Sequence, residues 1–248
     1  MEKRRYTIPD ALRGFALAEM IIYHTLWDIV FIFGVNLNWF RGTGAYIWQQ
    51  SICWIFILLS GFCVNFSCRK LKRSLTVIIC SAIISVITIL ALPDSAVRFG
   101  VLCLIGFGML IMVPLDKLFS KVNPIPAAII FFCLFLITKN VPYGFLGFEK
   151  LNLLEIPAVL YQNYLTAFLG FPPTDFYSSD YFPLLPWIFL YITGYFIYHI
   201  FKKYKFLLLL SAVSIAPLEW LGRHSLIIYM LHQPLIYGVL WIIFSVIS

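Results

Sequence analysis

Long apolar runs dominate this chain and restrict the folds that it can adopt. Hydrophobic residues make up 62% of the 248 residues and charged residues only 12%, about half the charged share of a typical soluble domain. Inside a bilayer every backbone N–H and C=O must be bonded within the protein, so an apolar run of roughly 20 residues predicts a membrane-spanning α-helix. We therefore predict an all-α, polytopic helical membrane protein, with residues 1–248 forming a single transmembrane domain.

Hydropathy windows of about 19 residues place seven spans along the chain. Two further apolar segments leave alternatives open. The segment Phe206–Leu221 is either an eighth span or a helix lying at the membrane surface, and Leu154–Phe171 is similarly ambiguous and is a candidate re-entrant segment. The seven predicted spans are Pro9–Gly34, Ala45–Ser67, Leu75–Leu92, Val97–Pro114, Ile125–Thr138, Pro183–Phe201 and Ser225–Ile247.

Basic residues indicate how the spans are oriented. They gather in four stretches that fall on one side of the membrane if seven spans alternate. Because Lys and Arg accumulate in cytoplasmic loops, we expect a multi-pass protein of the cell membrane with a cytoplasmic amino terminus and with Lys139–Phe182 outside. The net charge of +7 then follows from topology, so we predict no nucleic-acid partner. The stretches are residues 2–5, 69–73, 117–121 and 202–205.

The first predicted span is unusual because it contains several ionisable residues. The stretch DALRGFALAEMIIYHTLWD begins at Asp10, ends at Asp28 and includes Arg13, Glu19 and His24. Charge is costly in a bilayer core, so such residues indicate a functional site. Arg13 and His24 are 11 residues apart, which on an α-helix is three turns plus about 20° and about 16 Å along the axis. They therefore share one face at two different depths.

The depth of each side chain suggests its role. An arginine at the membrane surface can bind phosphate in a bidentate manner, or it can simply extend to keep its charge in water. A histidine at mid-depth can accept and return a proton near neutral pH, or it can bridge two helices. Asp28 is placed to accept a hydrogen bond from His24 and fix its tautomer. Glu19 points about 140° away from His24, so we expect its partner on another helix.

A second polar cluster begins the last predicted span, in the sequence GRHSLIIYMLHQPL of Gly222–Leu235. Ser225, Tyr229 and His232 follow one another at spacings of four and three, which places them on one helical face. Pro234 can kink the helix and free a carbonyl beside His232. This cluster is either a second part of the site or a set of residues that hold helices together.

Three polar residues elsewhere are further candidates. Gln49 and Gln50, at the outer end of the second span, either orient an acceptor or cap their helix. Asp180 precedes a proline-bounded helix start and is either its N-cap or a catalytic group. The six cysteines lack CxxC or Cys/His spacing, so we expect free thiols and no metal site.

Several of these motifs resemble known membrane acyltransferases. The pattern Arg13-x10-His24, after DAL, resembles the first helix of the acyltransferase-3 type, and Gly222–Leu235 resembles their GR-S-x-x-Y-x-x-H-x-P helix. The chain is more closely similar to the heparan-α-glucosaminide N-acetyltransferase catalytic-domain family, whose small bacterial members carry a comparable RG…M-x-x-x-H…D pattern. Two further elements of that family, WQQ…F…SG and DYFPLLPW, correspond to Trp48–Gly61 and Asp180–Trp187. The motifs occur in order over essentially the whole chain.

The resemblance implies an integral membrane acyltransferase that takes an acyl group, above all acetyl, from cytoplasmic acyl-CoA. The group is delivered across the membrane to a hydroxyl or amine of a glycan or small-molecule acceptor. The expected partners are therefore acyl-CoA, that acceptor and the lipid bilayer, with a homodimer as one form of assembly. No metal is expected.

The same resemblance assigns roles to the candidate residues. His24 would act as general base or carry the acyl group transiently, with support from Asp28 and His232. A further set of residues would bind the acceptor. The residues implied in donor binding are Arg13, Arg223, Ser225 and Tyr229, and those implied in acceptor binding are Gln49, Gln50 and Asp180.

One departure from the family pattern bears on the chemistry. In the family's animal lysosomal enzyme the position of His24 is an asparagine and the working histidine lies in the following loop, whereas Val35–Gly44 contains no histidine. Either His24 takes over the chemistry or this chain is not an acetyltransferase. Two other classes fit the same residues: a transporter or proton-coupled carrier that uses them as a relay, and a b-type haem protein with His24 and His232 as axial ligands.

Overall fold

The computed structural model of the chain, which describes residues 6–247, has the predicted helical membrane architecture. Seven helices of the described part are long and apolar enough to cross a membrane, the fifth together with the 3-10 turn that follows it. The predicted basic stretch at 2–5 lies outside the described residues. The seven helices are α1 (Thr7–Phe31), α2 (Thr43–Cys63), α3 (Lys70–Ala91), α4 (Val101–Phe119), α5 (Pro124–Thr138), α7 (Leu184–Lys203) and α9 (Ser225–Ile247).

The two ambiguous apolar segments do not form spans. Phe206–Leu221 contains the 3-10 helix η6 (Phe206–Ser211) and most of α8 (Ala216–Arg223). With eight residues, α8 is about 12 Å long, much less than the hydrocarbon thickness of about 30 Å. Leu154–Phe171 contains the end of β2 (Leu151–Glu155), the turn η5 (Ala158–Leu160) and the short helix α6 (Tyr164–Leu169). The eight-span alternative is therefore not realised.

The α4 helix differs from its predicted bounds at both ends. It was expected over Val97–Pro114, yet it begins at Val101 because Phe99 has a φ of 56° and is held outside the helix. The carbonyl of Phe99 accepts a hydrogen bond from Phe182 N at 2.9 Å. At its other end the helix continues through Pro114, since a proline removes a single backbone donor and a membrane helix can satisfy the freed carbonyl by other means.

The remaining elements are short and connect the spans. The strands β1 (Phe145–Phe148) and β2 form an antiparallel hairpin with a bulge between Leu146 and Gly147. The other 3-10 helices are η1 (Asn38–Arg41), η2 (Val64–Phe66), η3 (Pro93–Ser95) and η4 (Val141–Tyr143).

Packing divides the chain into two compact units. The first unit comprises the described residues of Met1–Phe56 and Lys205–Ser248, and the second comprises Ile57–Tyr204. The boundary falls inside α2, so the assignment of residues 1–248 to a single domain stays a prediction.

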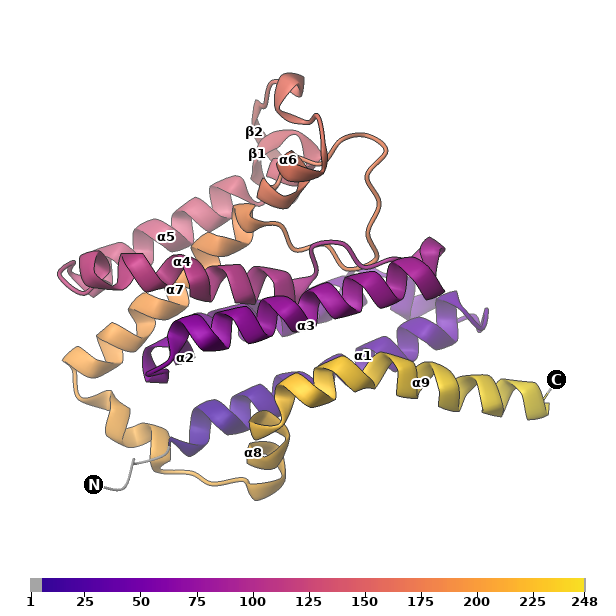
Figure 1. The fold of residues 1–248 in the computed structure, drawn as a ribbon, viewed down its shortest axis with the longest axis horizontal. Coiled ribbons are helices and arrows are strands. Elements are labelled where there is room, and N and C mark those ends of the chain that lie inside the picture. Colours follow the sequence, from indigo (N-terminus) through magenta and orange to yellow (C-terminus); the bar gives the residue numbers. More distant parts are fainter. Residues whose placement is uncertain (1–5, 248) are drawn as a thin grey trace. The chain divides into compact units, whose positions relative to one another are not determined.

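In the first unit α1 packs against α8 and α9 (Figure 1). The α1–α8 contact is close because Gly14 and Gly222 lie where the two backbones meet. A Cβ atom on Gly14 would collide with the carbonyl oxygen of Leu218, and one on Gly222 with that of Asp10. The helices can therefore approach this closely only because both positions are glycine.

In the second unit α3 packs against α4 and α5 packs against α7 (Figure 1). The core is aromatic, and Tyr191, Tyr195 and Phe196 of α7 are almost fully buried. A Cβ on Gly194 would collide with the carbonyl oxygen of Leu58, so α7 and the second half of α2 also pack backbone against backbone. The β1–β2 hairpin and α6 lie beside the end of α5 (Figure 1).

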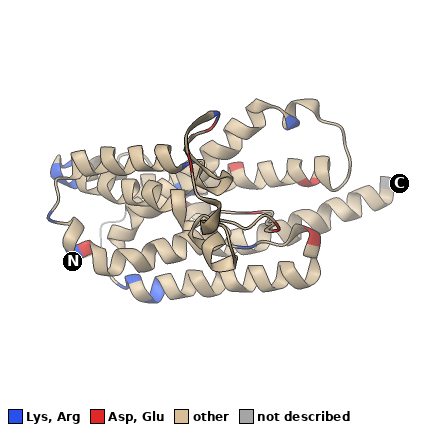
Figure 2. Cartoon of the chain, turned by 90° about the horizontal axis from the view of Figure 1, so that it is seen from above, with Lys and Arg blue, Asp and Glu red and all other residues tan. Residues whose placement is uncertain are grey.

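Charged residues avoid the middle of nearly every span, as the mostly tan helices of Figure 2 show. The helices α2, α5 and α9 contain no Lys, Arg, Asp or Glu, and those of α3, α4 and α7 lie in terminal turns. Among the seven spans, α1 alone carries such residues within its interior, namely Arg13 and Glu19. The exception that the sequence predicts for the first span is therefore confirmed.

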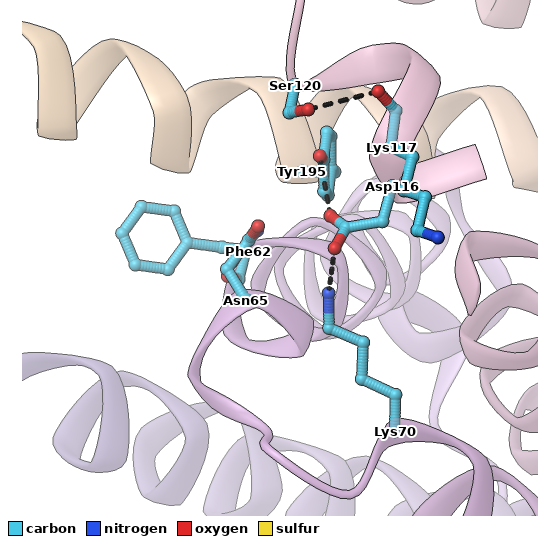
Figure 3. A network of polar contacts seen from close by, with 7 residues as sticks. All are labelled: Phe62, Asn65, Lys70, Asp116, Lys117, Ser120 and Tyr195. Atoms are coloured by element: carbon cyan, nitrogen blue, oxygen red, sulfur yellow. Dashed lines mark hydrogen bonds and ion pairs between the residues drawn. The ribbon is translucent and has the colours of Figure 1, made fainter. Parts of the chain in front are cut away.

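An ion pair and a hydrogen bond, both to Asp116, join three helices at one end of the second unit (Figure 3). Lys70 Nζ, in the first turn of α3, lies 2.7 Å from Asp116 Oδ2 in the last turn of α4. The hydroxyl of Tyr195 in α7 donates to Asp116 Oδ1 at 2.8 Å. The basic stretches at 69–73 and 117–121, which adjoin Lys70 and Asp116, therefore lie at one end of this unit, and the predicted orientation in the membrane stays a prediction.

Candidate functional site

The polar residues of α1 and α9 meet in the first unit. The ring centroids of His24 and His232 are 5.1 Å apart, with 56° between the ring planes. One residue after His232, Gln233 Nε2 donates a hydrogen bond to Asp28 Oδ1 at 2.8 Å. Asp28 is fully buried and His232 is buried. The structure thus brings the three catalytic candidates together and adds Gln233, which sequence reasoning missed.

Asp28 does not orient His24 in the way that the sequence predicts. Its Oδ1 atom accepts from Gln233, and its Oδ2 atom has no hydrogen-bond partner among the described residues. Both side chains project from α1 toward α9, where the His24 ring meets His232 and the Asp28 carboxylate meets Gln233. The expected hydrogen bond within α1 is therefore replaced by two separate contacts between helices.

The tautomer of His232 follows from its hydrogen bond to the backbone. His232 Nδ1 lies 2.5 Å from the carbonyl oxygen of Tyr229. A carbonyl can only accept, so we assign the proton to Nδ1, and the neutral ring then has its lone pair on Nε2.

The helix α9 continues through Pro234, which leaves the carbonyl of Met230 without a helical donor. The carbonyl that binds His232 is therefore not the one that Pro234 frees.

Three buried atoms at this site have no hydrogen-bond partner within the described part of the chain: Asp28 Oδ2, His232 Nε2 and Gln233 Oε1. All three are acceptors, given that the Gln233 amide donates to Asp28 and that His232 carries its proton on Nδ1. Buried polar atoms are nearly always paired, with protein or with water. A buried group of unpaired acceptors is suited to a ligand that brings several N–H or O–H donors.

The two candidate arginines flank the α1–α8 contact. Arg13 precedes Gly14 and Arg223 follows Gly222, the two glycines at which the backbones meet. Arg13 Nη1 lies 3.4 Å from Asp10 Oδ1. Arg223 is exposed, and its Nε donates to the carbonyl of Glu219 at 3.2 Å. Each guanidinium has five N–H groups, of which the contact named here uses one, so each side chain has the capacity to bind an anionic ligand as well.

Glu19 has its partner on another helix, as the sequence predicts. Its Oε2 atom accepts a hydrogen bond from Trp48 Nε1 of α2 at 2.7 Å. Trp48 also packs edge to face against Tyr23, with ring centroids 5.4 Å apart. Nothing in the sequence spacing identified Trp48 as that partner, because the two residues come from different helices.

The other predicted residues are more scattered. The ring of Tyr229 lies 5.3 Å from that of His232, whereas Ser225 begins α9, about 10 Å along the axis from His232. Gln50 accepts a hydrogen bond from Trp54 Nε1 at 3.4 Å within α2, and Gln49 is half-buried. The roles of these residues in binding stay predictions.

Asp180 belongs to the second unit, where it caps a helix. Its Oδ2 atom accepts a hydrogen bond from the backbone N–H of Val101, at 3.2 Å. The capped helix is α4, not α7, which Asp180 precedes in the sequence. Its role in acceptor binding stays a prediction.

No cluster of three or more potential metal ligands occurs among the described residues. None of the six cysteines, all of which lie among the described residues, forms a disulfide.

Comparison with known proteins places the chain in a family. The family model for heparan-α-glucosaminide N-acetyltransferase, catalytic, matches residues 5–234. The matched segment includes the polar residues of α1 and, on α9, His232 and Gln233. No curated protein and no solved structure matches the chain, and the likeness to acyltransferase-3 enzymes stays a prediction. The chain belongs to the heparan-α-glucosaminide N-acetyltransferase catalytic family, which implies a membrane acetyltransferase-like function.

Proposed function

We propose that this protein transfers an acetyl group from acetyl-CoA to a primary amine that binds at Asp28, His232 and Gln233. The observation that carries the proposal is the set of three buried acceptor atoms without partners. A protonated amine has three N–H donors and one positive charge, which complement one carboxylate and two neutral acceptors. A hydroxyl acceptor has a single donor and would leave the other acceptors unpaired, at a cost of about 1–3 kcal/mol for each buried group.

His232 is the proposed general base. Its Nδ1 is occupied by the Tyr229 carbonyl, so Nε2 can take a proton from the bound ammonium group and generate the neutral amine. The amine then attacks the thioester carbonyl of acetyl-CoA, a C–N bond forms, the C–S bond breaks, and the electron pair leaves with the sulfur. The nitrogen, which is positively charged after the attack, gives its second proton to His24, whose ring contacts that of His232, and His24 passes this proton to the departing thiolate.

The donor is proposed to bind with its phosphates at the α1–α8 contact. Arg13 and Arg223 flank that contact, and guanidinium groups bind phosphate oxygens in a bidentate manner. Along α1, Arg13 and His24 are separated by about 16 Å, close to the reach of an extended pantetheine arm. Phosphates held at the arginines would thus allow the thioester to reach the histidines.

The proposal includes the orientation of the enzyme. Acetyl-CoA is a cytoplasmic metabolite, and the basic stretches favour a cytoplasmic amino terminus, so Arg13 lies at the cytoplasmic end of α1. The acceptor, an amine of a glycan or small molecule, then approaches from the opposite side of the cell membrane.

The distance between the histidines argues against the haem alternative. Two imidazoles that ligate a haem iron from opposite faces, at about 2 Å each, have ring centroids roughly 6 Å apart. The centroids of His24 and His232 are closer than this, at 5.1 Å. A porphyrin between the rings would require α1 and α9 to separate.

The proposal is tested by comparing an amino sugar with its hydroxyl analogue as acceptors in proteoliposomes supplied with radiolabelled acetyl-CoA. We expect N-acetylated product from the amine alone. Asp28→Asn keeps the shape of the side chain and removes its charge, so it should raise KM for the amine about 10–100-fold, since hydrogen bonds to charged groups contribute about 1.5–3 kcal/mol.

Asp94→Asn, at an exposed carboxylate of the second unit, serves as the matched control and should leave KM unchanged. Equal acetylation of the hydroxyl analogue would contradict the assignment of the acceptor. An unchanged KM for the amine in Asp28→Asn would contradict the assignment of the site.

A further inference from the structure

The segment between α5 and α7 presents apolar side chains outward. All five residues of β2 are exposed, and their leucines, Leu151, Leu153 and Leu154, are each at least 60% exposed. On α6, Leu165 is 71% exposed. In a connection surrounded by water, several large apolar side chains would normally be turned toward the protein. A contiguous exposed apolar patch instead marks a surface that binds a partner or a membrane.

The polar side chains of this segment form hydrogen bonds to the residues that follow α5. Asn140 Nδ2 donates to Asn152 Oδ1 at 2.9 Å, and the hydroxyl of Tyr161 donates to the carbonyl of Val141 at 2.6 Å. Burial raises the pKa of the Tyr161 phenol, so it remains a protonated donor at neutral pH. These bonds fix the hairpin and the residues after it to the end of α5, so the outward leucines belong to an ordered structure.

The segment begins and ends at the surface of the membrane, because it joins the end of one span to the start of the next. Between residues 141 and 172 its only charged residues are Glu149, Lys150 and Glu155. The first two form the turn of the hairpin. The apolar surface of β2 and α6 is therefore interrupted by little charge.

We propose that residues 151–169 lie in the interface of the bilayer leaflet at which α5 ends, with the leucines of β2 and α6 inserted among the lipids. Lipid is the favoured occupant because the hairpin packs on the end of the span α5, and Ile130 and Ile137 of that span are exposed. The exposed rings of Tyr143 and Tyr164 are the residue type that is enriched at the level of the headgroups.

The hairpin also limits how deep the segment can lie. The sheet has two strands among the described residues, so the outer edge of β2 has unpaired backbone groups. Such an edge is not tolerated in the hydrocarbon core, whereas at the boundary between headgroups and acyl chains it can bond to water. The proposal therefore places the segment on the membrane surface, about 5–10 Å into that boundary, and not across the bilayer.

The test replaces single residues of the full-length protein by the photoreactive amino acid p-benzoylphenylalanine, in phosphatidylcholine nanodiscs. Substitution at Leu153 tests the surroundings of β2, and substitution at Leu165 tests those of α6. Ile130 on α5 is the control for lipid contact, and the exposed Thr174 is the control for water. After irradiation, intact-protein mass spectrometry identifies what each position has bonded to. If the variant at 153 does not reconstitute into nanodiscs, position 151 of β2 is used instead. Position 169 of α6 likewise stands in for position 165.

We expect a phospholipid adduct at positions 153, 165 and 130 and none at 174. Absence of any adduct at 153 and 165, with the adduct at 130 present, would show that the segment is in water and overturn the proposal. A protein–protein adduct at 153 or 165 would assign this surface to a second copy of the chain and would also overturn it.

Discussion

At the scale of the residue, the site depends on which atoms are already bonded. The Tyr229 carbonyl occupies His232 Nδ1, and the Gln233 amide occupies Asp28 Oδ1, so each residue has one acceptor left. The first bond lies within α9, at a spacing of three residues, whereas the second is not visible in the spacing of either helix alone. The two helices contribute complementary halves, and the pair Asp28–Gln233 joins residues 205 positions apart.

The arginines at the α1–α8 contact give a prediction for the donor. Arg13→Ala and Arg223→Ala should each weaken acetyl-CoA binding about 10–100-fold, because each removes a charge-assisted contact of about 1.5–3 kcal/mol. Arg13→Lys should recover part of the affinity, since it restores the charge without the bidentate geometry. Isothermal titration calorimetry of the purified protein measures the effect.

Arg41→Ala is the matched control, since Arg41 is exposed beyond the far end of α1 and should not influence the donor. Wild-type affinity in both Arg13→Ala and Arg223→Ala would show that the two side chains only extend toward water.

At the scale of the element, the α1–α8 contact is the feature that positions the two arginines proposed to bind the donor. The helix α8 is too short to cross the membrane, and it packs on the first turns of α1 because neither Gly14 nor Gly222 has a side chain. Glu219 fixes the start of α8, since its Oε1 accepts from the Ile215 N–H at 3.0 Å and from the Ser214 hydroxyl at 2.6 Å. The short helix is thus held at both its start and its contact face.

This contact predicts how alanine substitutions act. Gly14→Ala and Gly222→Ala should each destabilise the protein by about 1–3 kcal/mol, because the new methyl group overlaps a backbone carbonyl of the facing helix. Gly238→Ala in α9, where a Cβ meets nothing within 4 Å, should be neutral or slightly stabilising. Thermal unfolding in detergent compares the three variants, and a loss of stability as large in Gly238→Ala would refute the packing argument.

The elements themselves were largely predictable, and their contacts were not. Runs of about 20 apolar residues can only form helices in a bilayer, so seven spans followed from hydropathy, with α9 predicted at its observed bounds. The polar faces of α1 and α9 followed from helical spacing. That these two faces meet did not, because helix pairing depends on the shapes of side chains that are far apart in the sequence. The partners Gln233 and Trp48 were missed for this reason.

At the scale of the whole molecule, the distribution of charge relates the fold to its function. In the described spans, interior charged residues are confined to α1, and in the second unit Lys70 at the start of α3 pairs with Asp116 at the end of α4. The first feature marks the helix that carries the proposed site. The orientation, with a cytoplasmic donor and an external acceptor, stays a prediction.

That orientation is open to a direct test. Single cysteines at Thr174 and Lys72, both exposed, are introduced into a chain whose six native cysteines are replaced by serine. A membrane-impermeant maleimide applied to intact cells should label the cysteine at 174 and reach the one at 72 only after permeabilisation. The reverse pattern, or labelling of both positions in intact cells, would contradict the predicted topology.

The central claim is that the α1–α9 site performs acetyl transfer, and the rate of transfer in His232→Ala tests it most directly. His224 is the matched control, because its Nδ1 also lies against a carbonyl of the preceding turn, that of Trp220 at 2.9 Å, yet it is exposed. With radiolabelled acetyl-CoA and an amino-sugar acceptor in proteoliposomes, His232→Ala should lose about 10²–10⁴-fold in rate at unchanged thermal stability, and His24→Ala should also be impaired. His224→Ala should keep the wild-type rate. Transfer by His232→Ala at the rate of His224→Ala would contradict the account.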